Sequence, residues 1–460
     1  MKKLVKVYEW LIYLLPAILF CSYYPLISLG SSANMNFELS LPLIWLVIFD
    51  IFSFVLFLTT LKFKKQYPGI TDRRFFFISL FPFFATVSIF WSPNPVRGIL
   101  TAGILWAIFF AAFFIVYLTK NLPNIKITRA KILKAIFIPA IIISVWCWSQ
   151  SILDLAGVSS EQTLMCSGCV YQAFGFPHPN GLAIEPQFMG NLLLAPTILA
   201  LYCFLQNYKS KKYLCLSLFL ATTLFIIFSR GAIYSFIIAS TLLIVYYIIK
   251  QKTAKPLLAA LAIAVAFLFA LNAQGIMAVL SPTSDTYYTG ISKSINQLSL
   301  GKITLPELSK PETPVAEPAV EESRFSGYVQ ESTDVRVSLS SAAIDIWSSN
   351  PKKTLFGVGL GGSGEVLKRS GATDLSKEII QNEFLAILLE TGLIGIAILL
   401  ISVITVMKLV IKTSDRILII VLAVAYVVSL MFFSGLPNAV HIYLMPALIA
   451  YNSTRKKFVS

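Results

Sequence analysis

The sequence predicts a polytopic α-helical membrane protein. Of its 460 residues, 57% are hydrophobic and only 13% are charged, whereas a soluble domain carries about 25% charged residues. The apolar residues recur in runs of about 20, the length that a helix needs to cross a bilayer. Within lipid such a run has to be helical, because a helix satisfies its own backbone hydrogen bonds. Lys and Arg gather between alternate runs, as expected of a chain that crosses a membrane repeatedly.

The apolar runs divide the chain into about twelve expected transmembrane helices. They lie at approximately 9–29, 41–61, 75–92, 98–119, 133–153, 186–206, 213–228, 232–249, 256–274, 382–404, 416–433 and 437–451. The expected organisation is therefore residues 1–274 with nine helices, 275–380 as one large extracytoplasmic loop with an amphipathic helix, and 381–460 with three helices.

The net charge of +15 is explained by this topology rather than by a nucleic-acid partner. With the N-terminus inside, the short inner loops are basic, as in the loop that contains Lys64 and Lys65. Both termini are therefore expected in the cytoplasm. The basic start, with Lys2 and Lys3, also resembles a signal peptide. The apolar run to Gly30 is long for one, however, so we expect an uncleaved first helix.

Two features of the apolar part have open interpretations. Asp50 lies within the second expected span, where an ionisable group is costly and often functional, although it could also be neutral and hydrogen-bonded to a neighbouring helix. Cys166 and Cys169 lie in an outer loop as C-S-G-C. A metal site would need two more ligands and only His178 is nearby, so a disulfide or two free thiols is the plainer interpretation.

The loop before the sixth span contains two candidate site residues, His178 and Glu185. It ends F-G-F-P-H-P-N-G-L-A-I-E-P, and its prolines and glycines make regular structure improbable until Pro186 opens the next helix. Glu185 is either a carboxylate that interacts with the dipole at a helix start or one that faces a substrate cavity. Both residues are expected at the outer membrane face.

A very short connection, F-S-R-G-A, joins the seventh and eighth spans and carries Arg230. A guanidinium at such a hairpin can extend toward lipid headgroups, which is the structural explanation. Ser229 and Gly231 on either side leave room for a ligand, and we therefore favour a functional role for Arg230.

The large loop is expected to contain two different parts. The segment P-E-L-S-K-P-E-T-P-V-A-E-P is rich in proline and glutamate and cannot bury enough apolar surface to fold alone, so it is expected to be a spacer or lid. After Arg336, four apolar residues recur at helical spacing and predict an amphipathic helix on the membrane surface that ends at Asn350-Pro351. The four residues are Leu339, Ala343, Ile346 and Trp347.

The segment G-V-G-L-G-G at 357–362 formally fits a dinucleotide-binding motif. No βαβ pattern surrounds it, and on the outer side there are no cytosolic nucleotides, so we reject that function. We expect its glycines to let the backbone turn tightly against helix ends.

Three motifs in the second half of the chain together resemble the O-antigen polymerase and ligase superfamily. They are S-R-G-A at 229–232, then R-x(10)-W-x(3)-P-x(4)-F-G-V-G-L-G from Arg336, then Q-N-E-F-L-x(4)-E-T-G-L-I-G from Gln381. The resemblance implies a glycosyltransferase of the membrane-embedded GT-C type that needs neither a metal nor a cofactor. Its donor would be a glycan on undecaprenyl diphosphate at the outer face of the bacterial inner membrane.

By this resemblance, Arg230 and Arg336 match the arginines that bind the diphosphate of the donor. The leaving diphosphate develops negative charge as the glycosidic bond breaks. Guanidinium groups pair bidentately with phosphate oxygens and stay charged at any working pH. Donors placed where charge develops usually make the largest catalytic contribution.

The acceptor hydroxyl needs a group that orients it and accepts its proton. In ligases of the superfamily a histidine is proposed for this work, at the position of Gln381 here, and glutamine accepts no proton at neutral pH. Glu383 and Glu390 are seven residues apart and share one helix face, about 10.5 Å apart along the axis. We expect Glu383 to be catalytic with Gln381, and Asn382 to contact substrate. Glu390 is expected either to pair with an arginine and fix the helix, or to act as the general base or bind the acceptor.

Two histidines remain as alternative bases. His178 shares the expected outer face, whereas His441, after the turn F-S-G-L-P-N, is less clearly placed.

The sequence therefore favours a polymerase of lipid-linked glycan repeats over a ligase that transfers glycan to lipid A core or protein. The expected partners are the donor, a glycan or lipid acceptor, membrane lipids and, as an open question, a chain-length regulator. A transporter or flippase for lipid-linked sugars is the alternative from another class, but it predicts repeated halves that the sequence lacks. A catalytically inactive scaffold also remains open because of Gln381.

Overall fold

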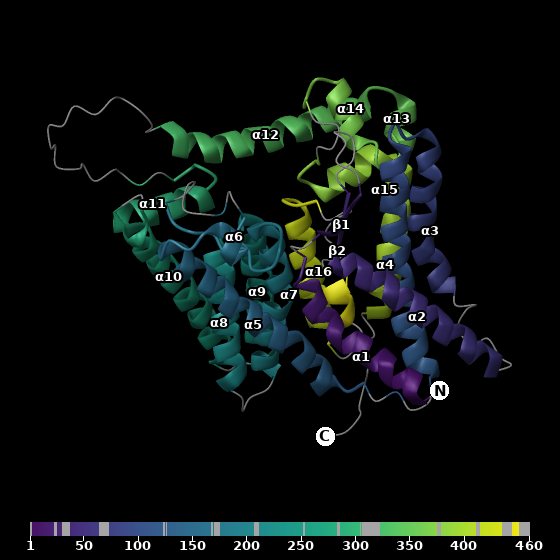
Figure 1. Ribbon diagram of the computed structural model, residues 1–460, viewed down its shortest axis with the longest axis horizontal. Coiled ribbons are helices and arrows are strands. Elements are labelled where there is room, and N and C mark those ends of the chain that lie inside the picture. Colours follow the sequence, from purple (N-terminus) through teal and green to yellow (C-terminus); the bar gives the residue numbers. More distant parts are fainter. Residues whose placement is uncertain are drawn as a thin grey trace. The chain divides into compact units, whose positions relative to one another are not determined.

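The structure is a computed structural model that consists mostly of helices (Figure 1). It describes residues 2–22, 25–29, 37–63, 73–122, 125, 127–166, 169, 175–206, 211–251, 254–282, 286–303, 305, 323–374, 379–410, 415–434 and 444–449. These residues form two compact units, which are described separately below. The first unit is Met1–Ala140 with Leu339–Ser460, and the second unit is Ile141–Ser338.

Eight of the described helices are long and apolar enough to cross a membrane, which confirms the polytopic α-helical class. They are α2 (Leu41–Phe63), α3 (Arg73–Ser88), α4 (Pro95–Asn121), α5 (Arg129–Leu155), α7 (Pro186–Gln206), α9 (Arg230–Gln251), α10 (Lys255–Leu280) and α15 (Glu383–Val410). Two shorter helices, α8 (Lys211–Ile227) and α16 (Arg416–Leu430), match two further expected spans. The expected span at 437–451 lies largely outside the described residues, of which 444–449 are helical.

The expected first span at 9–29 is wrong at both ends. Helix α1 runs from Lys2 to Leu19 and carries four charged residues. Strand β1 (Pro25–Leu29) follows it and pairs antiparallel with β2 (Phe37–Ser40). Pro25 disfavours the expected continuation of the helix to residue 29, because proline cannot donate the backbone hydrogen bond that a helix running through it would need.

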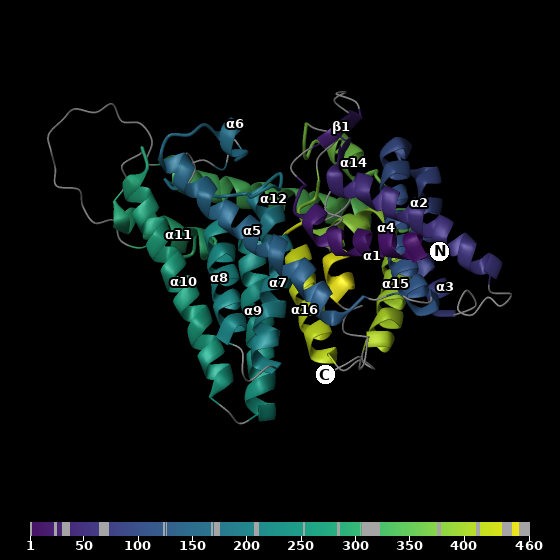
Figure 2. The same cartoon turned by 60° about the horizontal axis from the view of Figure 1, so that its bottom comes forward.

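Helices α1–α4, α15 and α16 build the first unit. Helix α2 lies beside α1 and α4, and α3 packs against α15 (Figures 1 and 2). The hydroxyl of Tyr8 in α1 donates a hydrogen bond of 3.0 Å to the carbonyl of Phe114 in α4. Ser402 of α15 donates one of 2.9 Å to the carbonyl of Phe77 in α3. These buried polar contacts fix the pairing of helices that are otherwise apolar, because a buried donor is costly to leave unsatisfied.

Helices α7–α10 form the core of the second unit and lie side by side (Figures 1 and 2). Helix α11 (Tyr287–Leu298) packs against α10, where Gly275 lets Tyr287 approach closely. Ser294 of α11 donates a 2.9 Å hydrogen bond to Gln274 of α10. The sequence did not predict α11. Helix α10 also ends at Leu280 rather than at 274, so the ordered chain extends further into the expected loop.

Helix α12 (Ser323–Ser348) corrects the expected position of Arg336. The residue lies within this 26-residue helix instead of heading it. The expected apolar stripe is confirmed, because Leu339 and Ala343 are buried with Val358 and Leu389 in one core cluster. The proline- and glutamate-rich segment at 306–322 lies outside the described residues.

Helix α12 ends at Ser348, just before Asn350-Pro351 as expected, and Asn350 caps the next helix. Its side-chain oxygen accepts a 2.9 Å hydrogen bond from the backbone N–H of Lys353 in α13 (Pro351–Phe356). Proline at the first position of a helix and asparagine at its N-cap are the residues that such a start favours.

Candidate functional site

The glycine-rich segment 357–362 packs closely against three helices of the first unit, as the sequence predicts. Gly357, Gly359 and Gly361 all have positive φ, at 72°, 94° and 77°. A Cβ atom at Gly359 would lie 2.6 Å from the backbone nitrogen of Ser92, and one at Gly361 would lie 2.8 Å from the carbonyl carbon of Arg97. Only glycine fits such positions readily. Helix α13, not a strand, precedes the segment, which agrees with the rejection of a dinucleotide site.

The same segment stabilises a break in helix α15. The backbone of Gly392 is non-helical, with φ 66° and ψ −170°. Such a break releases carbonyl groups from their helical partners. Val358 donates its N–H to the Leu389 carbonyl at 2.8 Å, and Gly359 donates its N–H to the Glu390 carbonyl at 2.9 Å. The segment thus fixes the backbone of Glu390, one of the residues singled out in the sequence.

A pocket lies next to this break, within the first unit. It encloses about 520 Å³ of empty space, including its open mouth. Its lining residues are Phe81, Arg97, Thr101, Leu105, Leu360, Ser363, Ile379, Ile380, Glu383, Ala386, Ile387, Glu390, Thr391 and Ser434. The pocket therefore combines one guanidinium, two carboxylates and several hydroxyls with apolar walls.

The two glutamates share this pocket, as their spacing of seven residues predicts. Glu383 is 2% exposed, and its Oε2 atom accepts a 2.9 Å hydrogen bond from the Ser434 hydroxyl. Glu390 is partly buried, and its Oε1 atom accepts a longer bond of 3.4 Å from the Ser363 backbone N–H. The sequence left open that Glu390 pairs with an arginine. Among the described residues, Glu390 forms no ion pair within 4.0 Å. Both carboxylates are therefore present in the pocket as acceptors.

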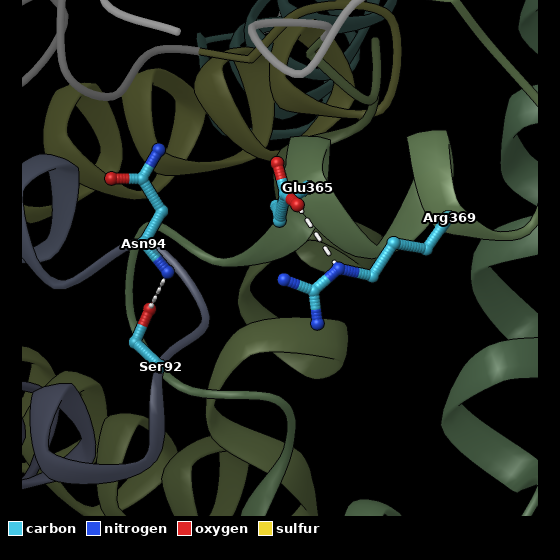
Figure 3. A network of polar contacts seen from close by, with 4 residues as sticks. All are labelled: Ser92, Asn94, Glu365 and Arg369. Atoms are coloured by element: carbon cyan, nitrogen blue, oxygen red, sulfur yellow. Dashed lines mark hydrogen bonds and ion pairs between the residues drawn. The ribbon is translucent and has the colours of Figure 1, made fainter.

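Arg97 is a pocket residue that was not among the expected site residues, because it lies just before the expected span at 98–119. Helix α4 begins at Pro95, and Asn94 caps it by accepting a 3.2 Å hydrogen bond from the Arg97 N–H. The cap is itself held, since the Asn94 N–H donates to the Ser92 hydroxyl at 3.2 Å (Figure 3). The Asn-Pro pair is a typical helix-start signal. Recognising it would have placed Arg97 in the first turn of α4.

Helix α14 (Ser363–Arg369) follows the glycine-rich segment, and its charged residues are not part of the pocket lining. Arg369 donates from Nε to Glu365 at 3.0 Å, four residues apart on the same helix (Figure 3). The Arg369 side chain is 65% exposed, so this pair contributes little to stability. It is a surface pair, which makes Arg369 a useful control for the arginines discussed below.

Asn382 and Gln381 stand at the start of α15. The Asn382 side chain accepts a 3.1 Å hydrogen bond from the Leu385 N–H, which makes it the N-cap of that helix. This contact gives Asn382 a structural role, and its predicted contact with substrate stays a prediction. Gln381 directly precedes it and is partly buried.

The other four expected site residues belong to the second unit. Arg230 is the first residue of α9 and is partly buried. Ser229 beside it is buried against Gly190 of α7, where an added Cβ would lie 2.9 Å from the Ser229 Cβ. The room for a ligand that was expected at Ser229 is therefore filled by α7.

Arg336 and Glu185 interact electrostatically within the second unit. Partial burial raises the pKa of the Glu185 carboxyl, and the positive charge of Arg336 opposes this by lowering it. Glu185 is nevertheless exposed to solvent, so we attach little free energy to the shift. This interaction indicates that Arg336 of α12 lies near the residue that precedes α7.

His178 is buried, which argues against its role as a base. Its side chain is 6% exposed and its ring stacks on Phe176, with centroids 5.1 Å apart. Burial lowers the pKa of His178 to about 3, because the charged imidazolium loses its hydration. The ring is therefore neutral at physiological pH and a weak proton acceptor. The other alternative base, His441, lies outside the described residues.

Cys166 and Cys169 form a disulfide, which resolves the alternatives that the sequence left open. Among the described residues, no three His, Cys, Asp or Glu side chains come together as metal ligands. Asp50 lies in α2 and is not part of the pocket lining.

The structure thus groups the expected residues by unit. In the first unit, Glu383 and Glu390 can accept hydrogen bonds or a proton from hydroxyl groups, and Arg97 can donate to an oxygen. In the second unit, Arg230 and Arg336 offer guanidinium groups suited to an anion with several oxygens. The chemistry available is binding of a polyhydroxylated compound and of a phosphate-containing group, with carboxylates as proton acceptors.

Comparison with known proteins agrees with this chemistry. Residues 215–400 match the model of a family described as O-antigen ligase. The matched segment contains Arg230, Arg336, Gln381, Glu383 and Glu390. No curated protein matches the chain. Residues 215–400, which carry the arginine and glutamate motifs in or beside apolar helices, are thus similar to the O-antigen ligase family of membrane proteins.

Proposed function

We propose that the protein is a membrane glycosyltransferase that polymerises lipid-linked oligosaccharide repeats at the outer face of the bacterial inner membrane. The observation that carries the proposal is the composition of the matched segment. It contains the candidate residues Arg230, Arg336, Glu383 and Glu390, and the last two line one pocket together with Arg97. Anion-binding and hydroxyl-binding groups are the two kinds of group that glycosyl transfer from a lipid diphosphate requires.

Arg230 and Arg336 are assigned to the donor, an undecaprenyl-diphosphate-linked glycan. As the bond between the anomeric carbon and the phosphate oxygen breaks, that oxygen takes the electron pair and the diphosphate gains negative charge. Guanidinium groups stabilise this charge through paired N–H donors. Both residues are partly buried, and a charge interaction is stronger where water is partly excluded. No metal ion is required for this neutralisation.

Glu383 is assigned to the acceptor as the proton-accepting group. The acceptor hydroxyl would transfer its proton to the carboxylate while its oxygen forms the new bond to the anomeric carbon of the donor. The hydrogen bond from Ser434 holds the other oxygen atom of Glu383 at 2.9 Å, which orients the carboxylate. Glu390 and Arg97 would hold neighbouring sugar hydroxyls, and apolar side chains such as Phe81 would face the sugar ring.

A ligase is the second candidate, because the matched family is described as O-antigen ligase. Such an enzyme would use the same donor chemistry but transfer the finished glycan to lipid A core or protein. Gln381 favours the polymerase, since it stands where ligases of the superfamily carry a histidine. In this protein a carboxylate, not an imidazole, would accept the proton.

The proposed topology follows from the basic inner loops of the sequence. Both termini would lie in the cytoplasm, and Arg230, Arg336 and the pocket would lie on the outer side. The helices would adopt the GT-C type of fold, and a chain-length regulator is a further proposed partner.

Surface glycans of a strain that lacks this protein test the proposal. Glycans with a single repeat unit attached are expected if the protein is a polymerase. Accumulation of full-length polymer on the lipid carrier would instead indicate a ligase. Unchanged surface glycans of normal length would contradict both functions. Complementation with the Glu383→Gln variant is expected to fail, whereas Arg369→Ala is expected to restore the wild-type ladder.

A further inference from the structure

The turn that presents Arg230 contains a residue in a disfavoured conformation. Phe228, between α8 and α9, has φ 62°, in the left-handed region. A bulky side chain is rarely found there, because its Cβ crowds the following carbonyl. Such a conformation persists only where surrounding contacts hold it, and it often marks a functional position. Ser229 and Arg230 follow directly, so the geometry of this turn determines where the guanidinium emerges.

Two rings hold Phe228 in place on one side. Its ring centroid lies 5.5 Å from that of His178, at an interplanar angle of 69°, and 6.0 Å from that of Phe176, at 79°. Phe176 and His178 stack at 5.1 Å and 15°. All three side chains are buried. We refer to Phe176, His178 and Phe228 as the aromatic triad; edge-to-face and stacked contacts of this kind are favourable beyond simple burial.

Internal bonds of the loop before α7 fix the position of His178. The His178 N–H donates to the Cys169 carbonyl at 2.8 Å, and Cys169 is joined to Cys166 by the disulfide. The Cys166 N–H donates to Asn180 Oδ1 at 3.3 Å. The buried side chain of Gln150 in α5 accepts from the Gly181 N–H at 2.7 Å. Bonds within the loop therefore hold the segment around His178, and the bond from Gly181 ties the loop to α5.

Helix α7 also packs against the same turn. The absence of a side chain at Gly190 lets Ser229 and Ala232 come so close that a Cβ atom would lie 2.9 Å from each of their Cβ atoms. The Ser229 carbonyl accepts a 2.9 Å hydrogen bond from the Ile233 N–H. This bond closes the first turn of α9. The turn before Arg230 thus contributes Phe228 to the aromatic triad and packs against α7 through Ser229.

We propose that the aromatic triad and the disulfide-linked loop behind it position Arg230 for binding of the donor diphosphate, and that His178 acts through Phe228 instead of contacting substrate. The inference rests on the proposed function, in which Arg230 binds the diphosphate. It assigns His178 the role of a positioning residue whose ring shape matters and whose protonation does not. It also links the Cys166–Cys169 disulfide to donor affinity.

Binding of undecaprenyl diphosphate to the purified full-length protein in lipid nanodiscs tests this inference. Arg230→Ala is expected to weaken binding by about ten-fold or more. His178→Ala is expected to weaken it by about five-fold, whereas His178→Phe, which keeps a ring, should bind as the wild type does between pH 6 and 8. The double variant His178→Ala with Arg230→Ala should bind no more weakly than Arg230→Ala alone, because both changes act through one residue.

Controls separate positioning from general loss of structure. Tyr247→Ala removes a buried ring at the opposite end of α9, and it should lower the thermal midpoint without weakening binding. If His178→Ala does not fold, Cys166→Ser combined with Cys169→Ser gives the same test, with an expected loss of about three-fold in affinity.

Three results would overturn the inference. One is wild-type affinity in a folded His178→Ala or cysteine variant, and another is a loss in His178→Phe as large as in His178→Ala. The third is full additivity in the double variant. In each of these cases the donor assignment of Arg230 would stand, whereas wild-type affinity in Arg230→Ala would refute that assignment and the positioning role together.

Discussion

Replacing Gly392 by alanine is expected to disrupt the contact between α15 and the glycine-rich segment. The conformation at Gly392, φ 66° and ψ −170°, is almost exclusive to glycine and costs other residues roughly 1–3 kcal/mol. The new Cβ would meet the Leu355 carbonyl and lie 2.6 Å from the Gly357 nitrogen. Backbone atoms cannot rotate away, so the segment would have to move. Losing the hydrogen bonds from Val358 and Gly359 would add about 2 kcal/mol, for a total of roughly 3–5 kcal/mol.

Thermal midpoints in detergent and rates of glycan transfer measure this effect. Gly371→Ala is the matched control, since Gly371 also has positive φ, 77°, but a Cβ atom added there would meet nothing within 4 Å; it should cost only about 1–2 kcal/mol. Gly103→Ala, in helix α4 and also facing open space, should be neutral or slightly stabilising. Gly392→Ala should lose more stability than either control and should also lose transfer. An equal loss in Gly392→Ala and Gly371→Ala would refute the reasoning.

Three further predictions concern ionisable side chains. Arg336→Lys keeps the charge but loses the paired N–H donors, so the KM for the lipid-linked donor should rise about ten-fold, while Arg369→Ala should leave it unchanged. Arg97→Ala should raise the KM for the acceptor glycan by about ten-fold without weakening binding of undecaprenyl diphosphate; weaker diphosphate binding would contradict the acceptor assignment. Because the pKa of His178 is lowered to about 3, the unfolded chain binds a proton below pH 6.5 that the folded chain excludes. Stability should therefore fall as the pH drops from 6.5 toward 3, by about 2 kcal/mol at pH 5, and His178→Phe should lack this loss in thermal unfolding.

The sequence predicted most of the helices because their apolar runs have the length that lipid requires. It failed where apolar character does not distinguish helix from strand. The run after Leu19 includes Pro25 and forms β1, which pairs with β2. Helix α11 was missed for a different reason. It buries only a narrow face against α10, where Gly275 allows the close approach, and long-range packing of this kind leaves little trace in composition.

The candidate site was predictable to the extent that local patterns determine it. The spacing of Glu383 and Glu390 correctly indicates one helix face, and the glycines at 357–361 correctly indicate a tight turn. Arg97 comes from a segment nearly 300 residues away and reaches the pocket because Gly361 packs on its backbone. The burial of His178 depends in the same way on Phe228, a distant residue in an unusual conformation. Such contacts arise from tertiary structure and cannot be inferred from spacing along the chain.

Elongation of a lipid-linked glycan by the purified protein is the most direct test of the central claim. The full-length protein in liposomes is supplied with a single undecaprenyl-diphosphate-linked repeat unit, and product length is measured on a gel. The wild type and Arg369→Ala are expected to form longer glycans, whereas Arg230→Ala and Glu383→Gln, at equal abundance, are expected to form none. Absence of elongation by the wild type, or elongation by both variants at the wild-type rate, would contradict the proposed glycosyltransferase.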